Sequence, residues 1–389
     1  MKLHIKAAGL AAGLACLPTF SAAKVTFTGY GDLRYNAGTK LDLGGPAATL
    51  AKFTTTPQNS TSRGFSANAI GLFATTEIRE DLQFLMDLSF HGVGSQVGQL
   101  NLQYAYLHWF PVKDTNFNAG RVTLPFGYFN ENRFYAFQRH GITAPVFQSS
   151  ILGLPIADWG VTAQQRFPLE PFTVEATAYV INGYGAAQGQ KTALRSAAVP
   201  GAISLTTNLR ATDNNNKPAL GGRVALNNIG GLPVETGVSY YWGTWDSSGL
   251  EPMYMVDAHL HTYYAGFDFL LETLHIGVRG DTGFAQSIGS PNWSTDGGFA
   301  TLSYDALTVK GKTVVPYFQF ENYLSRPNSG DSPREKLRTL TAGAAVKIVP
   351  QVTLKGEFLR FSYVLPDVAS GGALSLVANQ VQMAVVVTF

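Results

Sequence analysis

The stretch LQFLMDLSFH, residues 82–91, decides the fold class because apolar and polar side chains alternate along it. One face carries Leu82, Phe84, Met86, Leu88 and Phe90, and the other carries Gln83, Asp87, Ser89 and His91. A period of two residues is that of a β-strand with two unlike faces, and an α-helix cannot use it. Residues 172–180, 234–242 and 274–281 repeat the pattern. The chain is therefore expected to be all-β.

The same reading along the whole chain predicts an even number of strands. There are sixteen candidates, namely 24–36, 64–78, 82–91, 100–110, 115–124, 158–167, 172–182, 220–227, 233–245, 254–270, 273–283, 295–305, 313–323, 336–348, 352–362 and 376–389. The links after even-numbered candidates are short, whereas the longest links, 37–63, 125–157 and 183–219, follow odd-numbered ones. Short turns at one end and long loops at the other are typical of an outer-membrane barrel. A soluble β-sandwich could account for any single strand, but it gives no reason for short turns at one end and long loops at the other.

Composition points to the same class. The chain has 389 residues, of which 14% are charged and 12% aromatic, with 41 glycines. An average soluble domain has about 25% charged residues. The aromatic content disfavours disorder, and no segment after the N-terminus offers about 20 consecutive apolar residues for a membrane helix.

The N-terminus is predicted to be a signal peptide, residues 1–23, so that the mature barrel spans 24–389. Lys2 and Lys6 precede an apolar run that ends in small residues before Lys24. A membrane anchor or a lipoprotein modified at Cys16 is the alternative. Cleavage removes the single cysteine and two of 28 basic residues, which leaves 26 basic against 26 acidic residues. A neutral mature chain argues against nucleic acid as a partner.

The segment GRVTLPFG, residues 120–127, carries a family resemblance, together with the amphipathic last strand that ends in Phe389. This segment resembles the end of the strand that enters the constriction loop in sixteen-stranded Gram-negative outer-membrane porins. It is also weakly similar to the phosphate-selective porins. The resemblance implies a water-filled channel, usually a homotrimer, with the third external loop folded into the barrel. Location in the outer membrane, with its lipid and lipopolysaccharide as partners, follows from the same resemblance.

The predicted third loop, residues 125–157, is long and has no alternation. Loops of this length in compact proteins are usually functional. Its charged residues and His140 are constriction candidates, as is the arginine just before it: Arg121, Glu131, Arg133, Arg139 and His140. The alternative is an external lid or a subunit contact.

Charges on the strands are expected to face the lumen, because lipid would penalise them. The basic candidates are Arg34, Arg166, Arg223, Arg279 and Lys355, and the acidic ones are Asp32, Asp87, Glu175, Glu235, Asp257, Asp281 and Glu357. For any one of these charged residues, the simplest interpretation is that it pairs with a charge on a neighbouring strand of a solvated wall. Asp257, His259 and His261 share one face and suggest a metal site, but a polar lumen wall explains them better.

The expected function is a porin for passive diffusion of small hydrophilic solutes or ions, with no reaction, no cofactor and no metal. The loop carries two arginines and one glutamate, which predicts weak anion selectivity. Two alternatives stay open: a barrel sheath around a partner such as an electron-conduit cytochrome, and an outer-membrane hydrolase. A wide empty lumen would favour the sheath, and a narrower barrel would favour the hydrolase.

Overall fold

The computed structural model describes residues 25–44, 64–91, 99–145, 157–185, 206–207, 215–246, 248–279, 292–305, 307–327, 335–367 and 372–389. The predicted signal peptide lies outside these ranges. Within them, no helix is long and apolar enough to cross a membrane.

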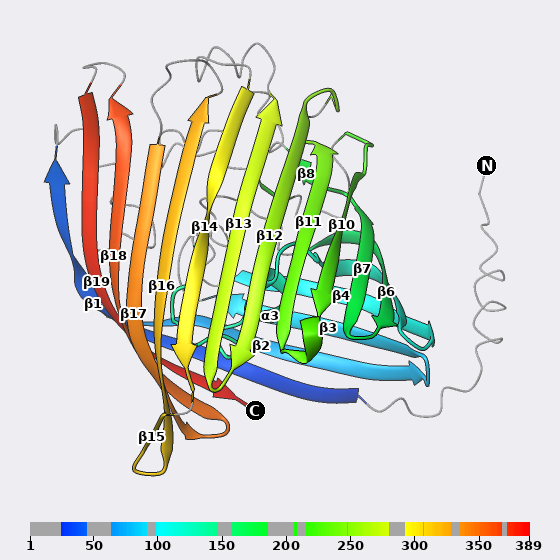
Figure 1. The fold of residues 1–389 in the computed structure, drawn as a ribbon, viewed down its shortest axis with the longest axis horizontal. Coiled ribbons are helices and arrows are strands. Elements are labelled where there is room, and N and C mark those ends of the chain that lie inside the picture. The colour runs from blue at the N-terminus through cyan, green and yellow to red at the C-terminus, as the bar shows by residue number, and fades with distance from the viewer. Residues whose placement is uncertain are drawn as a thin grey trace, which may run out of the picture.

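The described chain is almost entirely β-strand (Figure 1). The long strands are β1 (Val25–Gly44), β2 (Gly64–Arg79), β3 (Leu82–His91), β4 (Gln99–Val112), β5 (Thr115–Thr123), β6 (Ala157–Leu169), β7 (Phe172–Ile181), β10 (Ala219–Asn227), β11 (Val234–Thr244), β12 (Pro252–Tyr264), β13 (Phe267–Arg279), β14 (Asn292–Tyr304), β16 (Lys312–Pro327), β17 (Glu335–Val349), β18 (Val352–Asp367) and β19 (Gly372–Thr388). Short elements are β8 (Tyr184–Gly185), β9 (Thr206–Thr207), β15 (Leu307–Val309), the helix α3 (Phe129–Asn132) and the 3-10 turn η4 (Ile229–Gly231).

One antiparallel sheet of seventeen strands closes on itself. Strand β1 pairs with β2 on one side and with β19 on the other, and β7 pairs with β10 across the long connection between them. Without the three-residue β15, this closed sheet has the sixteen strands that the sequence predicts. Among the described residues, each long strand of this sheet is paired on both sides, which is the condition for a sheet to span a membrane.

The strand bounds confirm the predicted asymmetry between the two ends of the barrel. Turns such as 80–81, 170–171 and 350–351 link neighbouring strands at the end where β1 begins and β19 finishes. Two details differ from the prediction. Strand β1 continues to Gly44, because its far part pairs with β19 after a register shift at Asn36. The turn after β14 is not plain loop, because β15 forms a small hairpin with β16 there (Figure 1).

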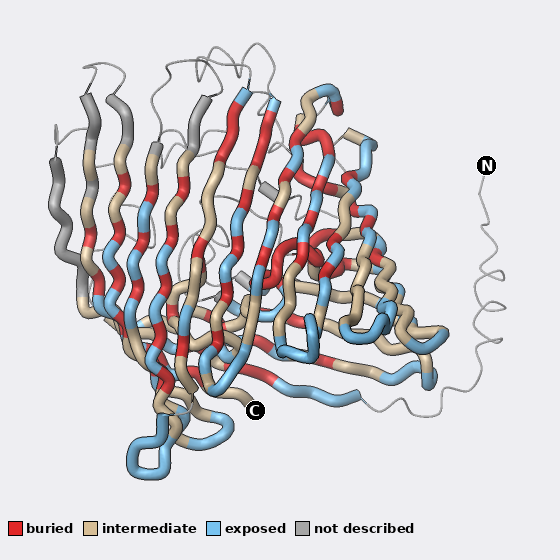
Figure 2. The backbone as a smooth tube through the Cα atoms, in the orientation of Figure 1, coloured by how far each residue is buried: buried red, intermediate tan, exposed pale blue. Residues whose placement is uncertain are grey.

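Buried and exposed residues alternate along the strands (Figure 2), and many of the large side chains on the exposed face are apolar, whereas many of the buried ones are polar or charged. Val224 and Val238 are half exposed, whereas Arg223 and Ser239 beside them are buried. Apolar side chains that point out of the closed wall would be exposed to water unless lipid covered them. This outer face therefore suits a hydrocarbon environment.

Strand β13 corrects one prediction. The sequence interpretation put Arg279 on the lumen face and Leu274, Ile276 and Val278 toward lipid. The structure reverses the two faces: the three apolar residues are buried with Glu272, and Arg279 is 68% exposed on the outer side. The rule that charge faces the lumen fails here because the inner wall is apolar at this end of the barrel. Asp281, on the same predicted face, lies outside the described residues.

Candidate functional site

The segment 124–145 follows β5 and contains the short helix α3. Its first residues are among the most buried of the chain: Leu124, Phe126 and Phe129 are each at most 3% exposed. The side-chain amide of Asn130 donates to the carbonyl of Leu124 at 2.7 Å and closes this turn. The segment is thus a compact element rather than an extended loop.

The first attachment of the segment to the wall is made by backbone amides. The N–H of Gly127 donates to Ser239 Oγ of β11 at 2.9 Å. The N–H groups of Tyr128 and Phe129 donate to Glu272 Oε2 of β13 at 3.2 and 3.0 Å. Gly127 has a φ of +70°, and a Cβ there would stand 2.1 Å from Glu272 Oε1. Only glycine allows the backbone to approach this carboxylate so closely.

The second attachment is an ion-pair cluster around Arg223 of β10. Its guanidinium donates to Glu131 Oε2 of the segment at 2.6 Å and also pairs with Glu235 of β11. Glu175 of β7 is 3.9 Å from the same guanidinium. Three carboxylates therefore share one buried arginine, and the charge of Glu131 is already paired.

The third attachment centres on Asp268 of β13, which pairs with Arg133 of the segment. His261 Nε2 lies 3.0 Å from Asp268 Oδ1, and His140 Nε2 lies 3.7 Å from Asp268 Oδ2. The ring of Tyr128 stacks on His261 with centroids 4.4 Å apart. Asp268 thus holds two predicted constriction residues, Arg133 and His140.

The fourth attachment lies toward β1–β3. The hydroxyl of Tyr135 donates to Asp87 Oδ2 of β3 at 2.5 Å. Its ring packs edge-on against Tyr30 of β1 and Phe73 of β2, with centroids 5.4 and 5.3 Å away, and stacks on Phe137. Aromatic contacts and one partly buried hydrogen bond anchor the middle of the segment here.

The fifth attachment is a pair of neighbouring inward residues on β18. Lys355 Nζ donates to the carbonyls of Ala136, Arg139 and Gly141 at 2.5, 2.5 and 3.2 Å. Glu357 accepts from the N–H of Ile142 at 2.8 Å and of Thr143 at 3.1 Å, and from the hydroxyl of Tyr317 of β16 at 2.6 Å. One lysine and one glutamate thereby hold both sides of the turn 136–143.

Arg139 is used within the segment itself. It donates from Nη1 to the carbonyl of Phe134 at 2.5 Å and from Nη2 to that of Ile142 at 2.9 Å. Burial, with the nearby Arg34 guanidinium adding to it, lowers the pKa of Arg139 to about 10. Arg139 is still cationic at neutral pH.

The other predicted pore residues have varied surroundings. Arg34 pairs with Asp32 at 2.7 Å on β1, and Arg166 pairs with Glu175 at 2.8 Å near a short turn. Arg121 donates from Nε to the carbonyls of Leu102 and Gln103 at 2.8 and 3.0 Å, just beyond the Ala105–Arg121 pair at which β4–β5 pairing ends. Arg121 therefore satisfies the backbone where these two strands separate.

The suggested metal ligands do not converge. His259 Nε2 lies 3.3 Å from Glu235, His261 approaches Asp268, and the Nδ1 of His259 is 3.9 Å from Asp257. In the part of the chain that the structure describes, no group of three such residues could hold a metal ion.

Sequence reasoning missed Asp268, Glu272 and Ser239 as partners of the loop. Asp268 and Glu272 alternate with apolar residues on β13, so the period-two pattern could have placed them on one face. Their role depends on contacts to residues more than 130 positions earlier in the chain, which the pattern does not encode.

The five attachments come from strands on several sides of the closed sheet: β3, β10, β11, β13 and β18. No protein-family model and no curated protein match this sequence. Solved structures do match in fold over nearly the whole chain. The anion-selective porin from Comamonas acidovorans has 12% identity and a TM-score of 0.57, and covers 94% of this chain and 100% of its own.

Two further solved structures agree with it. The outer membrane channel DcaP of Acinetobacter baumannii shares 12% identity at a TM-score of 0.56, over 96% of this chain and 99% of its own. OmpT, an outer membrane protein of Vibrio cholerae solved in a trimer form, shares 11% sequence identity at a TM-score of 0.56. The match covers 95% of this chain and 100% of the OmpT chain. The fold is that of a sixteen-stranded outer-membrane porin, which confirms the resemblance drawn from the sequence at the level of fold.

Proposed function

We propose that this protein is an outer-membrane porin through which small water-soluble solutes diffuse passively. The observation that carries the proposal is the segment 124–145, which bonds to the inner face of strands from several sides of a closed sixteen-stranded barrel. A barrel of this size encloses an aqueous channel unless something narrows it. We propose that the segment is that constriction, and its contacts with the inner face support this role; residues 146–156 of the predicted loop lie outside the described residues.

The attachments favour a channel over a sheath for a partner protein. A sheath needs a wide lumen, whereas here both ion pairs and backbone bonds hold a folded segment against the inner wall. Outer-membrane hydrolases usually have narrower barrels, so the sixteen strands of this barrel make a hydrolase the weaker alternative. We propose further that three copies assemble as a homotrimer in the outer membrane, beside lipid and lipopolysaccharide. The trimer form of the Vibrio cholerae structure supports this assembly.

Weak anion preference remains part of the proposal, and the name of the Comamonas porin is in keeping with it. The residues proposed to set it are those of the segment and of the adjoining wall, Glu131, Arg133, Arg139, His140, Arg34 and Lys355. Since Glu131 and Arg133 are each paired with an opposite charge, the net preference is expected to be small.

Reconstitution tests the proposal. Purified folded barrel in planar bilayers should give discrete, stepwise ionic currents, and proteoliposomes should admit small sugars but exclude large dextrans. If heat-modifiable migration shows that the protein is folded but it gives neither current nor solute entry, the channel function is refuted.

A further inference from the structure

Two buried carboxyl groups meet at the first attachment of the segment. Asp257 of β12 and Glu272 of β13 are each 1% exposed and point inward from neighbouring strands. Glu272 Oε1 and Asp257 Oδ1 lie 2.1 and 3.4 Å from the same point, the position that a Cβ on Gly127 would take. The two side chains are in hydrogen-bond contact with each other.

This contact needs a proton. Both oxygens of Asp257 and Oε1 of Glu272 are buried, and no other N–H or O–H group of the described residues donates to them. The second oxygen of Glu272, Oε2, accepts from the backbone N–H groups of Tyr128 and Phe129. Ionised carboxylates only accept hydrogen bonds, so two of them can bond to each other only if one carries a proton.

The charged groups nearby do not replace this proton. Those that face the pair are Arg223 of β10, Glu235 of β11, His259 of β12 and Glu131 of the segment. The guanidinium of Arg223 attracts both carboxyls, but its hydrogen bonds go to Glu131 and Glu235. His259 Nδ1 has no hydrogen-bond partner among the described residues and is 3.9 Å from Asp257 Oδ1. From β14, Phe299 lies opposite Glu272 and brings no charge.

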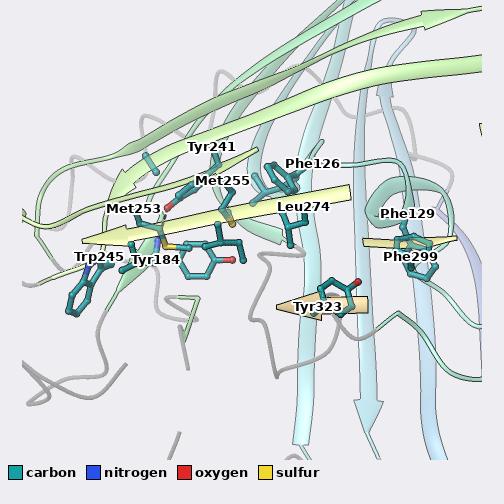
Figure 3. Packing of buried hydrophobic residues seen from close by; sticks show 14 of the residues in the cluster. Phe126, Phe129, Tyr184, Tyr241, Trp245, Met253, Met255, Leu274, Phe299 and Tyr323 are labelled. Carbon is teal, nitrogen blue, oxygen red and sulfur yellow. Dashed lines mark hydrogen bonds between the residues drawn. The ribbon is translucent and has the colours of Figure 1, made fainter. Parts of the chain in front are cut away.

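Toward the long connections the pair borders apolar side chains (Figure 3). Met255 lies two residues before Asp257 on the same face of β12, and Leu274 lies two residues after Glu272 on the same face of β13. Both are at most 5% exposed, and Phe126 of the segment belongs to the same buried cluster. Charge is costly in such surroundings, so one shared proton and one negative charge are favoured over two adjacent charges.

We infer that Asp257 is a positioning residue for the segment: its protonated carboxyl donates to Glu272 Oε1 and keeps Oε2 turned to the amides of Tyr128 and Phe129. Glu272 is the ionised member of the pair because it accepts two N–H groups, whereas Asp257 accepts none. When alkaline conditions remove the proton, two adjacent charges repel and this attachment loosens. The inference rests on the proposed channel function only for its consequence, a constriction whose hold depends on pH.

Amide exchange tests the role of the proton. Hydrogen–deuterium exchange of a peptide that covers residues 126–132, measured by mass spectrometry on the folded barrel, reports the opening of this attachment. Wild type and Asp257→Asn are compared at the same pH, so that the intrinsic pH dependence of exchange cancels. Asparagine is a donor that does not titrate. The wild-type rate relative to Asp257→Asn should be near one at about pH 6 and rise up to about tenfold per pH unit in the alkaline range, since one proton is linked to the opening.

Two further variants separate the proton from a merely structural role. Asp257→Ala removes the donor and the second charge together, so exchange should be about tenfold or more faster than in wild type at neutral pH, without the alkaline rise. Val256→Ala is the matched control, because its side chain lies on the opposite face of β12, and it should follow wild type at every pH. His140, His261 and Lys355 are present in all the variants, so their own titration cancels in the comparison.

Equal exchange in wild type and Asp257→Asn from about pH 5 to about pH 10 would overturn the inference, and would leave the channel function untouched. If exchange follows the expectation but the folded barrel passes no current, the channel function fails and the positioning role stands. Should Asp257→Asn not fold, the wild-type rate corrected for intrinsic exchange carries the same test, and a corrected rate without an alkaline rise would overturn the inference.

Discussion

Glu357 offers the sharpest test of whether the segment 124–145 is held in place from the wall. Its carboxylate accepts hydrogen bonds from the backbone N–H groups of Ile142 and Thr143, from the Thr143 hydroxyl and from Tyr317. Glu357→Ala removes all of these acceptors at once and leaves two buried amides without a partner. The turn 136–143 should then detach more often.

The magnitude follows from the two amide bonds alone. A hydrogen bond to a charged group contributes about 1.5–3 kcal/mol, so two lost bonds cost at least about 3 kcal/mol. Since 1.4 kcal/mol is tenfold in an equilibrium constant, the detached fraction should rise by about 100-fold. Bonds from Lys355 remain and limit how far the turn moves.

A cysteine reporter measures this opening. Ile142 is 1% exposed, and the only native cysteine, Cys16, belongs to the predicted signal peptide. In an Ile142→Cys background, the rate of reaction with a small water-soluble thiol reagent should rise by about two orders of magnitude on adding Glu357→Ala, if opening precedes reaction. Glu357→Gln keeps one acceptor oxygen without the charge and should give an intermediate rate.

The matched control is Phe358→Ala, the next residue on β18, whose side chain points outward and is 43% exposed. It should leave the reaction rate unchanged although it removes a larger side-chain volume than Glu357→Ala does. Equal rates in the reference protein and in the Glu357→Ala variant, with folded yield maintained, would refute the idea that this carboxylate secures the segment.

Three further predictions concern topology, assembly and selectivity. Cysteines introduced at Gln58, Gly201 and Ser329, all in the long connections, should react with a membrane-impermeant reagent on intact cells, and cysteines at Glu170 and Asn228 should not; the opposite pattern would reverse the orientation. Phe389 exchanges two backbone hydrogen bonds with Gly29, at 2.7 and 3.0 Å, and deleting it should lower the yield of heat-modifiable barrel without changing single-channel conductance; equal yield at low and high expression would argue against this role. The double variant Arg133→Ala with Arg139→Ala leaves Asp268 without its arginine, so zero-current potentials in a KCl gradient should move toward cation selectivity. The shift should be larger at low salt than at about 1 M, where screening is strong. No shift would mean that these arginines do not act on permeating ions.

The fold could be predicted from the sequence because alternation and loop length are local properties. A residue's parity in a strand such as 82–91 is set by its neighbours, and the number and order of the strands follow from the same pattern along the chain. That parity puts Asp87, Ser239 and Glu357 on the face opposite Phe84, Tyr240 and Phe358, and the polarity of the two faces then predicts which of them points inward. Residues 274–279 show its limit, because alternation predicts two faces but not which of them is inside.

Only the tertiary structure decided which side chains act together. Arg223 holds Glu131 from 92 positions away, and Glu357 holds Ile142 from 215 positions away, because closing the barrel brings β10 and β18 around the segment that follows β5. The same closure makes the inside apolar at one end, where Met255, Leu274 and Phe361 come from distant strands to face a shared interior. Local sequence carries the period of each strand, but the partner of a buried charge and the environment of an inward face are set by residues that are near only in space.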